Sequence, residues 1–423
     1  MKKQNVIFLV ILICQQFLQA QQAETIYSRV TVVKPDKYYI QQAQLWKKLA
    51  ESTPSNANAW FNYYKAQRNL ETLKKTDNPH AENRFKELNE IVAKVNKYCP
   101  NSFEAHYMNW KNSNSNPALF HELQKAFEID SNRTDYFPDF VIYHEIMGNN
   151  QQKNYFLQKW AKSDVASPGL LNYAYNMLIG LDSNSIIITG GDNDTYYPWL
   201  IQEAYGIRKD VKVINIHLAF KPNVFKRYAS EIGIEYFDVE KINFKTFQYQ
   251  LIQKLKQLKI AQLNSMNAHA VINFKSSNIP QDKNEIQNSV YDHSKFKNGG
   301  IYFATTYVID SVDFNDVLKM SLVGLSYEFN LYPSGVKALN TLIKNYFQLF
   351  KLDYLSQPFY RDLSQSMVDK VNGNYLSSLF QLYDHYQKID LTRAKQIKKI
   401  AFAIAAKNNM QNEVIQLMGK EDE

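Results

Sequence analysis

The stretch from Ser185 to Asn215 decides the fold, and it reads SIIITGGDNDTYYPWLIQEAYGIRKDVKVIN. Three consecutive isoleucines favour a short buried strand, and two glycines end it. Pro198 fits the first turn of a following helix, because the N–H that proline lacks has no partner there. Gly206 suits the end of that helix. A second apolar run, 211–219, follows, so the stretch predicts a strand–helix–strand unit with parallel strands.

The residues after this unit predict the rest of a small α/β domain over 183–332. A polar, mainly helical stretch extends from about 223 to 297 and contains the apolar run 270–274. The segment GGIYFATTYV, 299–308, predicts a further strand, and 314–327 predicts a helix that leads into GLSYEF. We therefore expect a central α/β domain built on a parallel sheet.

Helices are expected on both sides of this domain. In 30–182, aromatic and apolar residues recur three and four positions apart, and turns rich in proline and asparagine separate them. The breaks recur every 30 to 46 residues, which indicates repeats similar to degenerate tetratricopeptide (TPR) units. Residues 333–423 predict a closing pair of helical repeats. The expected fold class is therefore mixed α and α/β.

The first 20 residues have the features of a secretory signal peptide. Lys2 and Lys3 form a positive start, and 6–14 is an apolar run too short to cross a bilayer as a helix. Leu12 and Ile13 precede Cys14 where lipid attachment requires small residues. We expect export to the periplasm through a Sec-type signal, no lipid anchor, and no transmembrane segment in the mature chain.

Composition excludes several classes of protein. Of the two cysteines, only Cys99 follows the expected signal peptide, so an intrachain disulfide is excluded. The net charge of +8 comes from scattered basic residues with no nucleic-acid motif, so no nucleic-acid partner is expected. No metal-binding or nucleophile motif occurs, and we predict neither a cofactor nor a metal.

One polar cluster stands out, between the first strand and its helix. Ligands bind at the carboxyl ends of strands in open α/β sheets. The candidate ligand-binding residues are Gly190, Gly191, Asp192, Asn193, Asp194, Thr195 and His217. His217 is expected near the end of the second strand, facing the same crevice as Asp192. Catalytic residues are left unassigned.

Other interpretations of this cluster stay open. Asp194 or Thr195 would cap the helix, Asp192 and Asn193 would brace the turn, and the glycines would supply positive φ. Alternatively, Asp192 and Asp194 would bind a metal or a sugar, as in enzymes or accessory factors of envelope glycan and glycoprotein metabolism.

The residues 186–215 resemble a segment in the soluble, extracytoplasmic part of a Bacteroidetes membrane-protein family of unknown function, which is related to eukaryotic protein O-mannosyltransferases. IYFATT (301–306) and GLSYEF (324–329) are similar to later elements of that family. Val323 stands where the family often has Glu, and Glu328 where it often has Arg. The resemblance covers about 185–330, and helical repeats around the unit also fit it.

The resemblance places transferase chemistry in a multispanning membrane part that has no counterpart in this sequence, so catalysis is not carried over. We expect a non-catalytic periplasmic scaffold or binding protein. Its helical repeats would hold an envelope protein or peptide, and its α/β domain would hold a ligand, with a sugar as one possibility.

Overall fold

The computed structural model describes residues 22–73, 86–276, 299–307, 320–359 and 361–420. The expected signal peptide lies outside these residues, as does Cys14. The chain divides into two compact units between Tyr136 and Phe137, and each unit is described by itself.

The first unit is helical. In α2 the buried residues Tyr39, Ala43, Trp46 and Ala50 are three or four positions apart, so they form one apolar stripe. Each helix contacts the next one along the chain, as stacked hairpins do. The elements are α2 Asp36–Ser52, α3 Ala57–Leu73, α4 Lys86–Tyr98, α5 Phe103–Asn112, the 3₁₀ turn η3 Pro117–Leu119 and α6 Phe120–Ile129.

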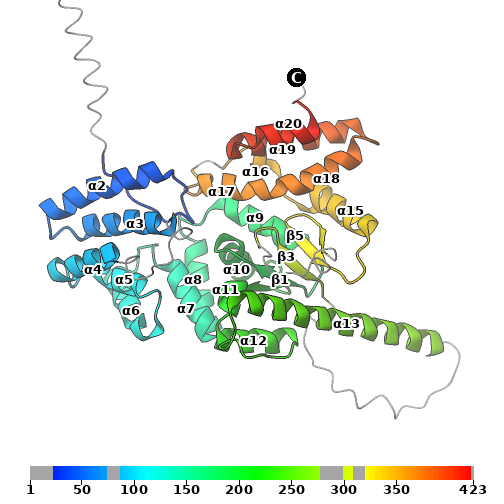
Figure 1. Ribbon diagram of the computed structural model, residues 1–423, viewed down its shortest axis with the longest axis horizontal. Helices are drawn as coiled ribbons and strands as arrows, with labels where there is room; N and C mark the ends of the chain where they lie inside the picture. Colours follow the sequence, from blue (N-terminus) through cyan, green and yellow to red (C-terminus); the bar gives the residue numbers. More distant parts are fainter. Residues whose placement is uncertain (1–21, 74–85, 277–298, 308–319, 360, 421–423) are drawn as a thin grey trace, which may run out of the picture. The chain divides into compact units, whose positions relative to one another are not determined.

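The second unit contains a five-stranded sheet in the order β2-β1-β3-β5-β4 (Figure 1). Its strands are β1 Ile186–Thr189, β2 Lys212–Asn215, β3 Ile301–Ala304, β4 Met320–Leu322 and β5 Ser326–Phe329. The central strand β1 pairs in parallel with β2 and with β3. The predicted strand–helix–strand unit is therefore confirmed, and so is the mixed α and α/β fold class.

Two details of the predicted sheet are wrong. The sheet is not wholly parallel, because β5 pairs antiparallel with both β3 and β4. Residues 320–327 were expected in a helix, but they form β4 and the start of β5. Gly324 adopts a φ of +138° in the turn between these strands, a conformation that suits glycine and interrupts a helix. The part of this predicted helix before residue 320 lies outside the described residues.

Helices cover both faces of the sheet. Because β2 and β3 flank β1 on opposite sides, right-handed crossovers place their connecting helices on opposite faces. Ile186, Ile188 and Phe303 pack against α12 Pro222–Ile232 and α13 Phe244–Ser276 in one core. The helix α10 Asn193–Tyr205 connects β1 with β2, and the long α13 is the green helix in Figure 1.

The remaining helices of the second unit precede or follow the sheet in sequence, except for α11, which directly follows β2. Their bounds are α7 Phe137–Met147, α8 Asn150–Ala161, α9 Pro168–Ile179, α11 Ile216–Ala219, α15 Gly335–Lys344, the π-helical turn η4 Asn345–Leu349, α16 Asp353–Ser356, α17 Gln365–Asn372, the 3₁₀ turn η5 Gly373–Tyr375, α18 Leu376–Tyr386, α19 Leu391–Asn408 and α20 Gln411–Met418. The helices expected after residue 333 are thus present.

The C-terminal helices share a core with α9. Asp362 accepts hydrogen bonds from the Ser167 hydroxyl at 2.8 Å and from the Gly169 N–H at 2.9 Å, at the start of α9. Further along the same helix, Asn176 donates to the buried Tyr375 hydroxyl at 2.8 Å. Helices α7–α9, expected as part of the first helical region, therefore belong to the same compact unit as the sheet.

Among the described residues, no helix combines the length and the apolar character that crossing a membrane requires.

Candidate functional site

The turn after β1 is organised around the Asp194 carboxylate. This buried side chain accepts hydrogen bonds from the N–H groups of Gly190 at 3.0 Å and Gly191 at 2.7 Å. The hydroxyl of Thr306, just beyond the end of β3, donates to the same carboxylate. Asp194 therefore links the carboxyl ends of β1 and β3.

The prediction that Asp194 or Thr195 caps the helix is wrong. The helix α10 begins at Asn193, and Asp192 is its N-cap residue without a side-chain capping bond. Asp194 and Thr195 thus lie inside the first turn, and both side chains bond back to residues before the helix.

The role expected of the glycines is also wrong, because neither Gly190 nor Gly191 has a positive φ. They are needed for close approach instead. A Cβ on Gly190 would lie 3.2 Å from the Tyr307 Cα atom, and one on Gly191 would lie 3.1 Å from the Asp194 carboxylate.

A second polar layer, formed by Thr189 on β1, Thr195 on α10 and Asn215 on β2, also holds the turn in place. The Thr195 hydroxyl donates to the Gly191 carbonyl at 2.6 Å and lies 2.7 Å from the Thr189 hydroxyl. The Asn215 amide donates to the Thr195 hydroxyl at 2.9 Å and to the Gly191 carbonyl at 3.1 Å. Because Thr189, Thr195 and Asn215 are buried and hydrogen-bonded to one another, this layer holds the turn rigidly.

Asp192 is exposed, and Asn193 beside it is half-buried. The Tyr196 hydroxyl donates to Asp192 at 3.2 Å. Burial, followed by the charge of Asp192, raises the pKa of Tyr196 well above its ordinary value, so this hydroxyl keeps its proton. Asp192 therefore braces the first turn of α10.

We expected His217 near the end of the second strand, but it lies beyond that strand. The second strand ends at Asn215, whose side chain accepts from the N–H groups of His217 and Leu218, each at 3.0 Å. This cap starts the short helix α11, which carries His217. The exposed imidazole stacks on the Phe244 ring, with 4.9 Å between centroids and 11° between planes.

His217 and Gly190 line a pocket of about 550 Å³. The other lining residues are Ile216, Asn243, Phe244, Lys245, Gln248, Thr306 and Tyr307. Of the predicted site, Asp192, Asn193, Asp194 and Thr195 are not among the lining residues, although Asp194 lies behind the wall through its bond to Thr306.

The pocket opens where the strand order reverses. The chain passes from β1 to β2 on one side and then crosses to β3 on the other side of β1. Gly190 follows the end of β1, and Thr306 and Tyr307 follow the end of β3. In doubly wound α/β folds this crevice is where ligands bind.

The hydrogen bonds of Asp194 argue against anion and metal binding at the turn of Gly190 and Gly191. The N–H groups of Gly190 and Gly191 would suit a phosphate, but Asp194 already accepts from both. The three donors on Asp194 leave about one of the roughly four lone-pair positions of its carboxylate for a metal ion. In the described part of the chain, no group of three or more His, Cys, Asp or Glu side chains is placed to hold a metal ion.

Sequence reasoning missed most of the pocket wall. Thr306 stood within the segment 301–306 that carries the family resemblance, and this was the one available signal. Residues 243–248 carried none, since they lie in a variable polar stretch. Asn243 there lies directly before α13 and caps it, because its side chain accepts from the Thr246 N–H at 2.8 Å.

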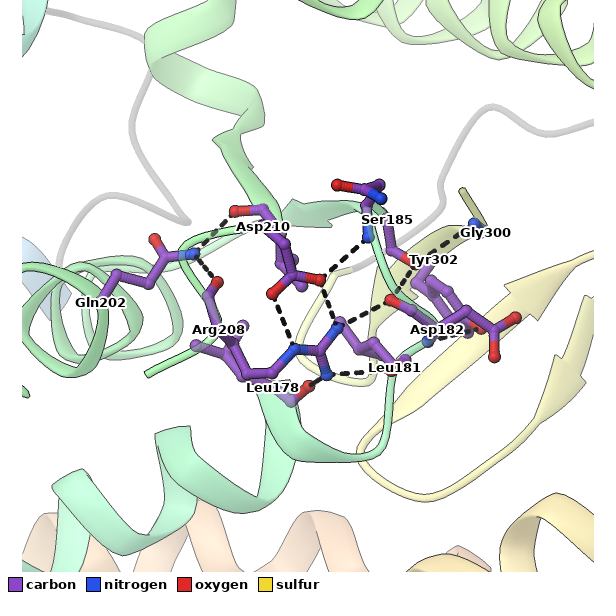
Figure 2. A network of polar contacts seen from close by, with 11 residues as sticks. Leu178, Leu181, Asp182, Ser185, Gln202, Arg208, Asp210, Gly300 and Tyr302 are labelled. Atoms are coloured by element: carbon purple, nitrogen blue, oxygen red, sulfur yellow. Dashed lines mark hydrogen bonds and ion pairs between the residues drawn. The ribbon is translucent and has the colours of Figure 1, made fainter. Parts of the chain in front are cut away.

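A separate network fixes the other end of the sheet (Figure 2). The Arg208 guanidinium donates to Asp210 and to three carbonyl oxygens at the end of α9 and beyond it, those of Leu178 at 2.5 Å, Leu181 at 2.9 Å and Asp182 at 2.7 Å. The hydrogen bond from Arg208 lowers the pKa of Asp210, so the pair stays charged. Arg208 and Asp210, which lie in the segment 186–215 that carries the resemblance, therefore form a structural clamp.

Comparison with known proteins supports part of the resemblance. Neither the search of curated proteins nor that of solved structures found a match. A comparison with family models matched one segment of the chain. This segment begins within α9 and ends directly before α15, so it contains the whole sheet and the pocket. Residues 170–334 match the model of a family described as TMEM260-associated domain 2.

Proposed function

We propose that this chain is an exported, non-catalytic binding protein whose α/β domain binds a small ligand in the pocket beside His217. The observation that carries the proposal is the position of the pocket, at the carboxyl ends of β1 and β3 where the strand order reverses. Rigid elements surround it, which favours recognition of a defined ligand.

The polar turn around Asp194, which suggested a ligand site, supports the wall of the pocket. Asp194 fixes Gly190 on one strand end and Thr306 on the other, and both of these residues line the pocket. The polar turn thus sets the shape of the pocket wall, while His217 and the first turn of α13 form the side where a ligand would enter.

The biological setting is proposed from the sequence. The chain is a soluble relative of the Bacteroidetes membrane proteins related to protein O-mannosyltransferases, and it acts in the periplasm. Its N-terminal helices are TPR-like repeats that hold an envelope protein or peptide. The match of residues 170–334 to the model of TMEM260-associated domain 2 supports the coarser part of this proposal, a relationship to a TMEM260-related family.

A ligand screen tests the pocket. The full mature chain is screened by thermal shift against sugars, amino acids, organic acids and short peptides. Each hit is then measured on His217→Ala and on the control Lys226→Ala, which changes an exposed residue of α12 outside the pocket. A ligand present at 100 times its Kd should stabilise the chain by about 2.7 kcal/mol. Hits that His217→Ala abolishes and Lys226→Ala retains support the proposal; hits insensitive to both contradict it.

Cell fractionation tests the location. The protein should be released by osmotic shock with an N-terminus near residue 21, as sequencing of the released chain would show. Recovery from the cytoplasm with residues 1–20 intact would contradict export.

A further inference from the structure

We propose that the ligand of the His217 pocket is a small organic anion, a carboxylate or a phosphate monoester, whose charge is bound by Lys245 and His217. This inference rests on the proposed function and adds the chemical class of the ligand. It is argued from the charges, the ring stack and the walls of the pocket.

The basic groups of the pocket have no opposing charge. Lys245 and His217 line it, and no aspartate or glutamate is among the lining residues. Neither side chain forms an ion pair with a residue in the described ranges, and both are exposed. Two basic groups that converge on one cavity without a counter-charge favour an anionic ligand.

The carboxylate of Asp194, which lies behind the wall at Thr306, does not reverse this balance. Asp194 accepts from two backbone N–H groups and from the Thr306 hydroxyl, so its charge is already stabilised by three donors. Those donors are thereby unavailable to the ligand, which must meet the Lys245 ammonium and the His217 ring instead. The positive end of the α13 backbone dipole lies on the same side, because Phe244 and Lys245 form the first turn of that helix.

The imidazole of His217 is held in place for such a contact. Its ring stacks on Phe244 and is therefore restrained, whereas no side-chain hydrogen bond to a described residue occupies its nitrogens. A restrained donor loses less conformational entropy when it binds than a free side chain does.

The walls indicate that the anion has an apolar part. Ile216 and Phe244 line the pocket beside the basic groups. Its volume of about 550 Å³ lies within the range of small-molecule sites, well above the size of one inorganic ion. The ligand class that fits is therefore an organic molecule with one acidic group.

Three probes of similar shape but different charge test whether charge governs binding: benzoate, phenyl phosphate and the neutral benzyl alcohol. Binding to the full mature chain is measured by saturation-transfer NMR and calorimetry at constant ionic strength. We expect at least one of the anions to bind about tenfold or more tightly than benzyl alcohol, as a charge-assisted contact would produce.

The same titrations are repeated on Lys245→Gln, His217→Gln and the matched control Lys226→Gln. The first two should each weaken anion binding about tenfold, and the control should leave it unchanged. An equal loss in Lys226→Gln would mean binding to the general positive charge of the protein and would overturn the inference.

The outcomes separate the two proposals. If only benzyl alcohol, or a neutral hit from the ligand screen, binds in a manner dependent on His217, the anion class is wrong and the binding function stands. If neither the probes nor the screen gives any His217-dependent binding, both are wrong.

Discussion

The hydroxyl of Thr306 donates a hydrogen bond to the carboxylate of Asp194 across 112 residues of sequence. This contact joins the end of β3 to the turn after β1, and through it Asp194 supports the pocket wall from behind. The predictions below follow from this contact and from three other buried contacts of the second unit.

Asp194→Ala should destabilise the protein by about 2–4 kcal/mol, because two part-buried N–H groups and a hydroxyl lose a charged acceptor. Loss of a helix cap alone would cost about 1 kcal/mol. Urea unfolding measures the difference. The control Asp192→Ala, at the exposed neighbouring position, should cost less than about 1 kcal/mol. Equal costs at the two positions would show that Asp194 is not the centre of the turn.

Divalent cations should give no Asp194-dependent stabilisation. Three donors already use most of the carboxylate's roughly four lone-pair positions. In the described residues, no group of three His, Cys, Asp or Glu side chains would complete a site for Mn²⁺ or Mg²⁺. Thermal shift with about 10 mM of either ion, roughly 100 times the Kd of even a weak site of about 0.1 mM, measures this, with calcium as a further ion. A rise in Tm that Asp194→Asn removes and Asp210→Asn retains would support a metal site and an enzymatic role.

Arg208→Lys should destabilise the protein nearly as much as Arg208→Ala, by about 2–4 kcal/mol. A single ammonium cannot replace the planar guanidinium that bonds three carbonyl oxygens and Asp210 at once (Figure 2). Chemical denaturation of both variants tests this. Arg393→Lys is the control, since that side chain is 49% exposed. Full rescue by lysine would mean that charge alone accounts for the clamp.

Glu145 should make stability depend on acid pH. Burial alone would raise its pKa, but the charges of Lys153 and Lys212, with hydrogen bonding to Lys153 and the charge of Arg227, hold the pKa at about 2. A carboxyl with a depressed pKa in the folded state stabilises the fold at pH values above its unfolded pKa. That contribution is lost as the pH falls from about 4.5 toward about 2.

Glu145→Gln should therefore cost about 3–5 kcal/mol at pH 7, because three part-buried cations lose the buried counter-charge that they share. The difference from the wild type should narrow between pH 4.5 and pH 2, measured by urea unfolding at each pH. The exposed Glu413 provides the control, and Glu413→Gln should leave the pH profile unchanged. A difference that is constant with pH would contradict the assigned pKa.

Gly169→Ala should destabilise the protein by about 1–3 kcal/mol through overpacking. The added methyl would lie 2.6 Å from a Val368 methyl of α17 and 2.9 Å from the Asp362 carboxylate. The double variant with Val368→Ala should recover part of the loss, as a double-mutant cycle would show. Gly335→Ala is the control, because its Cβ would meet no atom within 4 Å. Additive effects would contradict direct packing of α9 on the C-terminal helices.

Local patterns in the sequence were sufficient to predict β1, α10 and the parallel pairing with β2. Three isoleucines before two glycines indicate a strand end, and Gly206 indicates a helix end; it does adopt a φ of +71° there. These signals are local, because they depend on backbone dihedral angles and on short runs of apolar residues. For the same reason the candidate region of the chain could be located from its residues alone.

The sequence by itself determined the strand–helix–strand unit, the helices around it and the turn in which Asp194 lies, because backbone preferences and apolar spacing act between near neighbours. Only the tertiary structure decided which donors the Asp194 carboxylate meets, which ring orients His217, and that 320–327 forms strands. Those contacts join residues from distant parts of the chain, such as Asp194 with Thr306 and His217 with Phe244, and no local pattern encodes them.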